Sequence, residues 1–527
     1  MTKKENGKLK KKLGALDLFF LGVGAIIGSG WLYAAQNGAN LAGTYTWISW
    51  LIGAGIIILI GLVYAELAAA MPRAGGFVRY PDFSHGSTVG FLIGFLSMLA
   101  YSSVVAIEVE AVRGYAQYWW PALGQDDGAP TALGFGFQIF LLIVFFLLNY
   151  WSVNIFGKTN TVLTIFKFVV PALIIIFLLM HLEISNFSVG GADPGGLKGI
   201  FAAVTGAGIV FAFNGFRMPI EFAGEARKPQ KDIPRAIILS VLVGLLIYLL
   251  LQFAFIGAVP SDMLASGGWV SVNFDSPWAG LATAIGIGWL ANLVLLDAVV
   301  SPSATGNIYF SATARSLFAW AKNGTFYSLF QKIDKRTGLP RGALWLTLIL
   351  AILWMSPQQF RVWEGLVAGS TSAKALTFVV GPTSLMSLRK SKPDMKRPFF
   401  LKGAKVIAPL AFISATLVVY WAGWTTISLL VPIAIPSLIF YFAFVDKDQK
   451  FSGGEIKSHF KSSLWLIVYY FYMLVMSYMG SYIPEDMGPP IIEAPWDTAV
   501  CAIGSLFFYY WGVNSGLDNP QIEDSDE

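Results

Sequence analysis

Ionisable side chains inside apolar runs are the first candidates for chemistry in this sequence. Lys167 lies deep in "TVLTIFKFVVPAL", and Asp297 lies in "LVLLDAVV". A charge inside a membrane-spanning segment is costly, so each such residue is a functional candidate. We expect Lys167 to gain and release a proton as its surroundings change, with Asp297 as its electrostatic partner or as a second protonation site. The alternatives are a lysine bound permanently to carbonyl groups and a structural aspartate.

Three other charged residues each allow two interpretations. Arg217 lies in "NGFRMPIEF", where its guanidinium could hold a carboxylate through two hydrogen bonds or pair with Glu221 one turn later. Glu108 and Arg113 occupy another apolar run and could line a pocket. Because Glu110 and Arg113 are three residues apart on a helix, a local ion pair is slightly favoured for Arg113 over contact with a ligand.

Two apolar runs contain glycines where a membrane helix would favour leucine or alanine. "VGAIIGSGWL" spans residues 23–32, and "TGAGIVFAFNGF" spans residues 205–216. Each glycine costs about 1 kcal/mol of helix stability relative to alanine, and backbone groups left unpaired in lipid cost more. We predict interrupted helices whose freed backbone groups bind a ligand. The alternative is close helix packing through small residues.

The composition indicates a polytopic membrane protein. Of 527 residues, 56% are hydrophobic and only 13% are charged, which no soluble globular class matches. The single cysteine, Cys501, excludes an internal disulfide and a zinc or iron–sulfur cluster. No nucleotide-binding "GxxxxGK[ST]" run occurs. We expect no enzyme activity, no cofactor, no metal and no catalytic residues.

Apolar runs of membrane-spanning length predict an all-α protein with about fourteen transmembrane helices. The predicted spans cover residues 14–37, 44–70, 88–118, 133–151, 158–181, 199–223, 235–259, 279–310, 342–356, 362–388, 404–424, 427–445, 462–482 and 495–512.

Basic residues concentrate in alternate loops, such as residues 228–235 and the segment "LRKSKPDMKRPFFLKGAK", whereas acidic residues occupy the opposite loops. Lysine and arginine mark the cytoplasmic side of a membrane protein. We therefore predict a multi-pass protein of the cell membrane with cytoplasmic N- and C-termini. The net charge of +5 follows from this topology and requires no nucleic-acid partner.

The two glycine-rich interruptions fall in the first and the sixth predicted spans. Five spans form one repeat, and because five is odd, the second copy is inverted. The predicted organisation is a basic N-terminus (1–13), a first five-helix repeat (14–181), an inverted second repeat (199–388), four additional helices (404–512) and an acidic tail (513–527).

Several motifs resemble one transporter family. "GAIIGSGWL", "VYAELAAAMPRAGG", "AGEARKPQKDIPRA" and "KRPFFLKG" are similar to segments of the amino acid-polyamine-organocation (APC) superfamily, and most similar to its aspartate-proton symporter subgroup. The resemblance implies a LeuT-type core of two inverted five-helix repeats, with helices 1 and 6 broken. It also implies uptake of an amino acid together with a proton.

The resemblance further implies a binding site at the two breaks. The substrate's α-carboxylate would bind the N–H groups of Ser29 and Gly30, with Gly28 permitting its close approach. Its ammonium group would bind carbonyls of Ala25 and Ile26 and of the segment Phe211 to Asn214. By the same similarity, Lys167 takes the place of a sodium ion, and Phe211 and Tyr309 correspond to gating aromatics.

These observations predict a secondary active transporter for an acidic amino acid, L-aspartate or L-glutamate, coupled to protons. Its partners would be substrate, protons and membrane lipid, and the oligomeric state stays open. A permease or exchanger for neutral or other amino acids is the alternative within transport. A transporter-like nutrient sensor is the alternative from another class.

Overall fold

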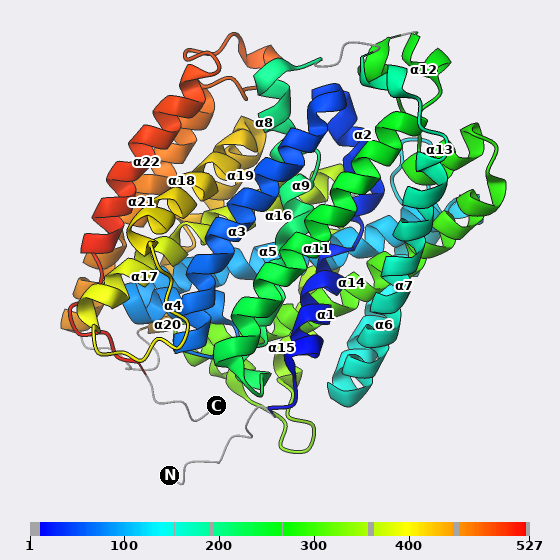
Figure 1. Cartoon of the computed structure of the whole chain (residues 1–527). Coiled ribbons are helices and arrows are strands. Elements are labelled where there is room, and N and C mark those ends of the chain that lie inside the picture. Colours follow the sequence, from blue (N-terminus) through cyan, green and yellow to red (C-terminus); the bar gives the residue numbers. More distant parts are fainter. Residues whose placement is uncertain are drawn as a thin grey trace.

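The computed structural model describes residues 11–151, 153–188, 194–265, 267–356, 363–445 and 453–522. Within these ranges the regular elements are helices (Figure 1). The α-helices are α1 (Ala15–Ile26), α2 (Gly30–Ala42), α3 (Thr46–Ala70), α4 (Gly76–His85), α5 (Ser87–Ala116), α6 (Ala132–Trp151), α7 (Val153–Leu179), α8 (Gly196–Gly206), α9 (Ile209–Phe213), α10 (Met218–Glu221), α11 (Pro229–Ala258), α12 (Ser261–Ala265), α13 (Pro277–Ala284), α14 (Gly288–Lys322), α15 (Arg341–Trp354), α16 (Trp363–Phe378), α17 (Val380–Ser391), α18 (Ala404–Trp421), α19 (Trp424–Ala434), α20 (Leu438–Val445), α21 (Gly453–Met479) and α22 (Trp496–Asn514).

Both predicted interruptions are present. The first predicted span consists of α1 and α2, which are separated by residues 27–29. The sixth consists of α8, α9 and α10, with a bend of 41° after α8 and a 3-10 turn at Asn214–Arg217. Gly208 begins the second part of this span with a φ of 82°, a left-handed conformation that favours glycine.

Helices also occupy the other predicted spans, with some changes of boundary. The eighth span was predicted at residues 279–310, but α14 runs for 35 residues from Gly288 to Lys322, and α13 precedes it as a separate helix. The tenth and twelfth spans are each divided, into α16 with α17 and α19 with α20. The loop after α3 contains the further helix α4.

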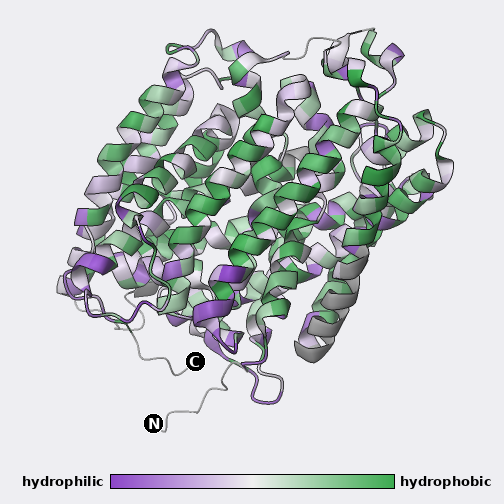
Figure 2. Cartoon of the chain, in the orientation of Figure 1, coloured by the Kyte–Doolittle hydropathy of each residue, from purple (hydrophilic) through white to green (hydrophobic). Residues whose placement is uncertain are grey.

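Among the described residues, eight helices are long and apolar enough to cross a membrane, or nine if the bent pair beginning at α8 counts as one span. Two shorter apolar helices lie at Ala15–Ile26 and Arg341–Trp354, and the part of α7 from Lys167 to Leu179 is also apolar. Hydrophobic residues cover the middle of the helices, and hydrophilic residues gather towards the ends (Figure 2). The protein is therefore a multi-pass membrane protein, and fourteen crossings remain a prediction.

The long helices α5 and α14 pack along each other and form the centre of the bundle. α16 packs against α5, α11 packs against α3, and the short helix α1 is enclosed by α7, α11, α14 and the turn after α9. The interruption after α1 consequently lies inside the protein, where every freed backbone group needs a partner from a neighbouring helix.

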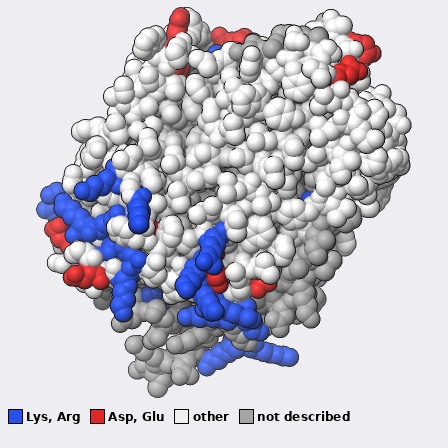
Figure 3. All heavy atoms as spheres, in the orientation of Figure 1, with Lys and Arg blue, Asp and Glu red and all other residues white. Residues whose placement is uncertain are grey.

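The described chain begins and ends at the same end of the bundle (Figure 1). On the face drawn in Figure 3, lysine and arginine side chains gather at this end, whereas the opposite end shows mainly acidic residues. Two ion pairs lie among the loops and helix ends here, one with a partly exposed arginine and one fully buried. Arg389 contacts Glu66 at 2.6 Å, and Arg315 contacts Glu225 at 2.5 Å.

Candidate functional site

The Lys167 side chain joins three helices at the first interruption. Its ammonium group on α7 donates to the carbonyls of Gly24 and Ile27 at 2.5 and 2.7 Å, and to the hydroxyl of Thr305 on α14 at 2.5 Å. Carbonyls at the C-terminal end of a helix lack partners within the helix. The lysine therefore binds the free carbonyls at the break in α1, which is the contact described by the alternative of a carbonyl-bound lysine, and proton exchange by Lys167 stays a prediction.

Two other side chains complete this end of α1. The Tyr248 hydroxyl on α11 donates to the Ile26 carbonyl at 2.6 Å, and Ser301 on α14 donates to the Ile27 carbonyl at 3.2 Å. Ile26 was predicted to bind a ligand's ammonium group together with Ala25. Its carbonyl already accepts a hydrogen bond from a side chain, so any ligand must share or replace that contact.

Glu108 lies against the start of α2. Its carboxylate accepts a hydrogen bond from the Ser29 N–H at 2.8 Å, in the position predicted for a ligand's carboxylate. A Cβ on Gly28 would lie 2.8 Å from the Glu108 carboxylate and 2.9 Å from the Thr305 hydroxyl. The absence of a side chain at Gly28 thus lets the Glu108 and Thr305 side chains come close, and the approach of a substrate carboxylate at this position stays a prediction.

The two interruptions lie side by side. A Cβ on Gly30 would be 3.1 Å from the Ala212 Cβ and 3.4 Å from the Phe211 ring. Both polar atoms of the Asn214 side chain are buried and have no hydrogen-bond partner among the described residues. The structure therefore brings together Ser29, Gly30 and the predicted segment that begins at Phe211.

Trp363 closes this region on one side. Its indole N–H donates to the Ser29 hydroxyl at 2.9 Å, and its ring meets Phe211 edge-on with the ring centroids 6.1 Å apart. The Tyr33 ring also packs against Trp363, with the two ring centroids 4.5 Å apart. The side chains at the interruptions are buried, with Phe211 exposing 6% and Tyr309 2% of their surfaces.

Arg113 belongs to an outer cavity and not to the interruptions. It forms an ion pair with Glu110, as predicted, and donates to Gln117 at 2.9 Å and to the Gly128 carbonyl at 2.7 Å. The cavity has a volume of about 520 Å³, and Tyr33 and Trp363 form part of its lining. These two rings separate Arg113 from Ser29, so Arg113 and Glu108 do not act in one cluster.

Arg217 is fully buried among aromatic rings. Its guanidinium carbon lies 3.9 Å from the Phe77 ring centroid and 4.4 Å from that of Tyr101. The predicted pair with Glu221 is not formed as a direct hydrogen bond, because no guanidinium nitrogen of Arg217 has such a partner among the described residues. Glu221 instead accepts a hydrogen bond from the Tyr101 hydroxyl at 2.5 Å. Aromatic rings therefore surround Arg217, and the alternative of a direct pair with Glu221 is not formed.

Asp297 is buried on α14, and neither carboxylate oxygen has a hydrogen-bond partner among the described residues. It therefore does not bind the Lys167 ammonium directly, which the sequence left open. Lys167 already has three oxygen partners, so Asp297 and Lys167 interact electrostatically without a direct hydrogen bond.

Lys374 on α16 is a buried cation that the sequence analysis missed. Its ammonium group lies 4.7 Å from the Phe211 ring centroid and 5.5 Å from that of Tyr309. It has no hydrogen-bond partner among the described residues. The signal was available, since a lysine inside the apolar run 362–388 meets the criterion that singled out Lys167.

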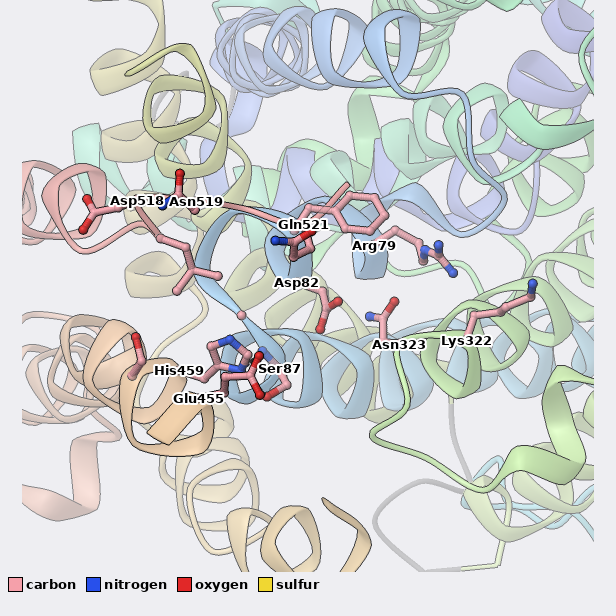
Figure 4. Close-up of a pocket in the computed structure, with 14 residues that line it drawn as sticks. Arg79, Asp82, Ser87, Lys322, Asn323, Glu455, His459, Asp518, Asn519 and Gln521 are labelled. Carbon is pink, nitrogen blue, oxygen red and sulfur yellow. Dashed lines mark hydrogen bonds between the residues drawn. The ribbon is translucent and has the colours of Figure 1, made fainter. Parts of the chain in front are cut away.

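A second cavity lies near the C-terminal end of the described chain. It has a volume of about 510 Å³, and Arg79, Asp82, Lys322, His459 and Asp518 are among the residues that line it (Figure 4). None of the predicted site residues lines it. Throughout the described ranges, no three His, Cys, Asp or Glu side chains come together as metal ligands would.

Comparisons with known proteins place this chain among amino acid permeases. A family model described as "Amino acid permease" matches residues 13–446. The chain is 44% identical over 522 residues to an aspartate-proton symporter of Bacillus subtilis (strain 168), covering 98% of this chain and 99% of the relative. It is 40% identical over 531 residues to the glutamate/serine transporter AimA of the same organism, covering 99% and 96%. The branched-chain amino acid permease BcaP, also from that organism, is 28% identical over 454 residues, covering 84% and 94%.

Proposed function

Since the chain belongs to the amino acid permease family, we propose that it is a secondary active transporter which imports L-aspartate or L-glutamate together with protons. The observation that carries this proposal is the 44% identity to an aspartate-proton symporter along nearly the whole of both chains. The transport cycle is alternating access around a central site. The substrate is an acidic amino acid and the coupled ion is a proton, so neither ATP nor a cofactor takes part.

The substrate's backbone groups bind at the two interruptions. Its α-carboxylate accepts hydrogen bonds from the N–H groups of Ser29 and Gly30. Its ammonium group donates hydrogen bonds to carbonyls of Ala25, Ile26 and the Phe211–Asn214 segment. The N-terminal end of a helix such as α2 favours an anion. The hydrogen bond from the Ser29 N–H to Glu108 supports this assignment, because it shows that this N–H can bind a carboxylate.

Lys167 couples the proton to the movement of α1. Protonated, it offers three donors, and three oxygens from α1 and α14 receive them. When Lys167 is deprotonated, it loses its charge and one donor, and its hydrogen bonds to the carbonyls at the end of α1 become weaker. Proton release therefore favours a state in which the inner half of the first span moves. Asp297 adds a second buried group that can carry a proton.

The two repeats cover residues 14–181 and 199–388, and each begins with an interrupted helix. The protein lies in the plasma membrane, surrounded by lipid, with both termini in the cytoplasm. The gathering of lysine and arginine at the end where the described chain starts and finishes supports this orientation (Figure 3). Residues 1–10 and 523–527 of the predicted basic N-terminus and acidic tail lie outside the described residues.

A wider specificity is the second candidate, since AimA is named a glutamate/serine transporter. Its specific support is that the contacts proposed for the α-carboxylate and the ammonium group are backbone contacts, which any amino acid could make. A neutral substrate would then compete with aspartate.

The deciding experiment is uptake of labelled aspartate into proteoliposomes under an imposed inward proton gradient, with unlabelled glutamate, serine, asparagine and arginine as competitors. We expect accumulation above equilibrium that collapses when a protonophore dissipates the gradient, with glutamate as the strongest competitor. Uptake that ignores the gradient would exclude proton symport. Stronger competition by serine or arginine would exclude the acidic preference.

A further inference from the structure

Lys374 is a buried cation without a counter-ion in direct contact. Its relative exposure is 0%, and its ammonium group has no hydrogen-bond partner among the described residues. By contrast, the buried Lys167 has three oxygen partners, and the buried Arg315 is paired with Glu225. A desolvated charge without partners is expensive. Such a group is retained where something else in the cycle supplies the missing partner.

The position of Lys374 identifies where that partner must bind. The ammonium group lies over the rings of Phe211 and Tyr309, and Phe211 in turn meets Trp363, whose indole is bonded to Ser29. α16 is fixed against α5 by the hydrogen bond from the Ser370 hydroxyl to the Ala100 carbonyl at 3.4 Å. Lys374 therefore reaches the two interruptions from a third helix, beside the residues proposed to bind the substrate backbone.

We propose that the Lys374 ammonium group binds the side-chain carboxylate of the substrate and thereby selects dicarboxylic amino acids. This inference rests on the proposed function. The interruptions bind the groups that all amino acids share, so selectivity requires a further contact. An acidic substrate supplies the missing counter-ion, whereas a neutral one leaves the cation buried and unpaired. A site that contains an unpaired buried charge rejects the substrate that cannot pair with it.

Arg217, which in the sequence is one candidate for binding a substrate carboxylate, is less suited to this role. Three ring centroids, those of Phe77, Tyr101 and Phe378, lie within 5.3 Å of its guanidinium carbon, and the Tyr101 hydroxyl bonds to Glu221 nearby. These rings stabilise the cation by facing it and leave little room for a carboxylate. Among the described residues, Lys374 lies over two rings, and the nearer of them, at 4.7 Å, is farther away than the two rings nearest to Arg217, at 3.9 and 4.4 Å.

Two charged groups act on Lys374 from neighbouring helices. Glu108 on α5 attracts it, and Arg217 repels it. The Glu108 carboxylate is held by the Ser29 N–H and does not hydrogen-bond to Lys374. A purely structural role for Lys374 would be to balance Glu108, and the experiment below separates the two roles.

The test is the substrate preference of Lys374→Met in proteoliposomes, measured as the ratio of aspartate to serine affinity. Methionine keeps much of the apolar stem and removes the charge. We expect aspartate affinity to fall about tenfold or more, because a hydrogen bond to a charged group contributes roughly 1.5 to 3 kcal/mol. Serine affinity should be unchanged or higher. An unchanged ratio, or equal loss for both substrates, would overturn the inference.

Two further variants keep the test decisive. Lys374→Arg retains the charge and should retain the preference for aspartate over serine, which also covers the case in which the methionine variant fails to fold. Loss of that preference in a folded arginine variant would count against the inference. Arg217→Met is the matched variant of the other buried cation. A selective loss of aspartate there, with none in Lys374→Met, would assign the contact to Arg217.

The wild-type protein separates the two proposals. Wild-type protein that transports neither aspartate nor glutamate overturns the proposed function and this inference together. Wild-type protein that imports aspartate, with an unaltered substrate ratio in Lys374→Met, overturns only the role of Lys374.

Discussion

The carboxylate of Glu108 accepts a hydrogen bond from the backbone N–H of Ser29 at 2.8 Å, across the first helix interruption. The protein thus holds one of its own carboxylates where the substrate carboxylate is proposed to bind. Substrate and side chain compete for the same donor. Binding therefore requires that Glu108 move away or lose its charge.

Glu108→Gln should raise aspartate affinity at neutral pH by about tenfold, because a neutral acceptor binds the Ser29 N–H less strongly than a carboxylate by roughly 1.5 kcal/mol. Equilibrium binding of labelled aspartate to purified protein measures this. Glu110→Gln is the control, since Glu110 contacts Arg113 and Gln138 and not Ser29. Lower affinity in Glu108→Gln would show that the carboxylate assists binding.

Lys167→Ala should abolish accumulation driven by a proton gradient while exchange of labelled for unlabelled aspartate continues. The variant removes the only proposed proton carrier that binds the end of α1 directly. Counterflow and gradient-driven uptake in the same liposomes separate the two activities. Lys198→Ala, at an exposed position in α8, should behave as the wild type. Wild-type accumulation in Lys167→Ala would remove this lysine from the coupling mechanism.

The buried pair of Glu225 and Arg315 should be a stability determinant. Glu225→Gln leaves a buried guanidinium uncompensated, at a cost of roughly 3 to 5 kcal/mol, and should lower the thermal unfolding midpoint clearly. The double variant Glu225→Gln with Arg315→Met should recover most of that loss. Asp334→Asn breaks the pair of Asp334 with Arg341, in which the Asp334 side chain is 25% exposed and the Arg341 side chain 34% exposed. This change should alter stability by less than about 1 kcal/mol. Equal effects of the buried and exposed pairs would contradict this expectation.

Gly215→Ala should destabilise the protein by roughly 1 to 3 kcal/mol. A Cβ there would lie 2.7 Å from the Ala25 carbonyl carbon and would also meet the backbone atoms Gly22 O and Ile26 N. Backbone cannot move aside as a flexible side chain can. Gly55→Ala in α3 is the matched control, because its Cβ would meet nothing within 4 Å. Alanine favours a helix interior by about 1 kcal/mol relative to glycine, so Gly55→Ala should be neutral or stabilising in a thermal unfolding assay.

The helices and the two interruptions were predictable from the sequence because both follow from local composition. Long apolar runs must satisfy their backbone groups internally, and glycine clusters mark where that fails. The end of α14 was not predictable in this way. Residues 311–322, "SATARSLFAWAK", look too polar for a buried helix, but Arg315 is paired with Glu225 and buried. α4 was missed for a similar reason, since it contains Pro81 and the buried Arg79.

The contacts of the candidate site were predictable only in part. Local spacing identified the pair of Arg113 with Glu110, because the two residues share one helix face. The rings around Arg217 and the oxygens around Lys167 come from segments far away in the chain, which spacing does not reveal. The Ile27 carbonyl, for example, is 140 residues from Lys167. Lys374 was missed although the rule used for Lys167 applies to it equally.

The interruption at the end of α1 has a consequence for biosynthesis. Its carbonyls are satisfied by Lys167, Tyr248 and Thr305, which lie between 140 and 281 residues downstream of the groups they bind. A ribosome that has delivered α1 to the membrane has not yet made any of these partners. Water or the insertion machinery must cover the carbonyls until α14 arrives. The first helix to enter the bilayer is therefore completed only after most of the first ten spans have been translated.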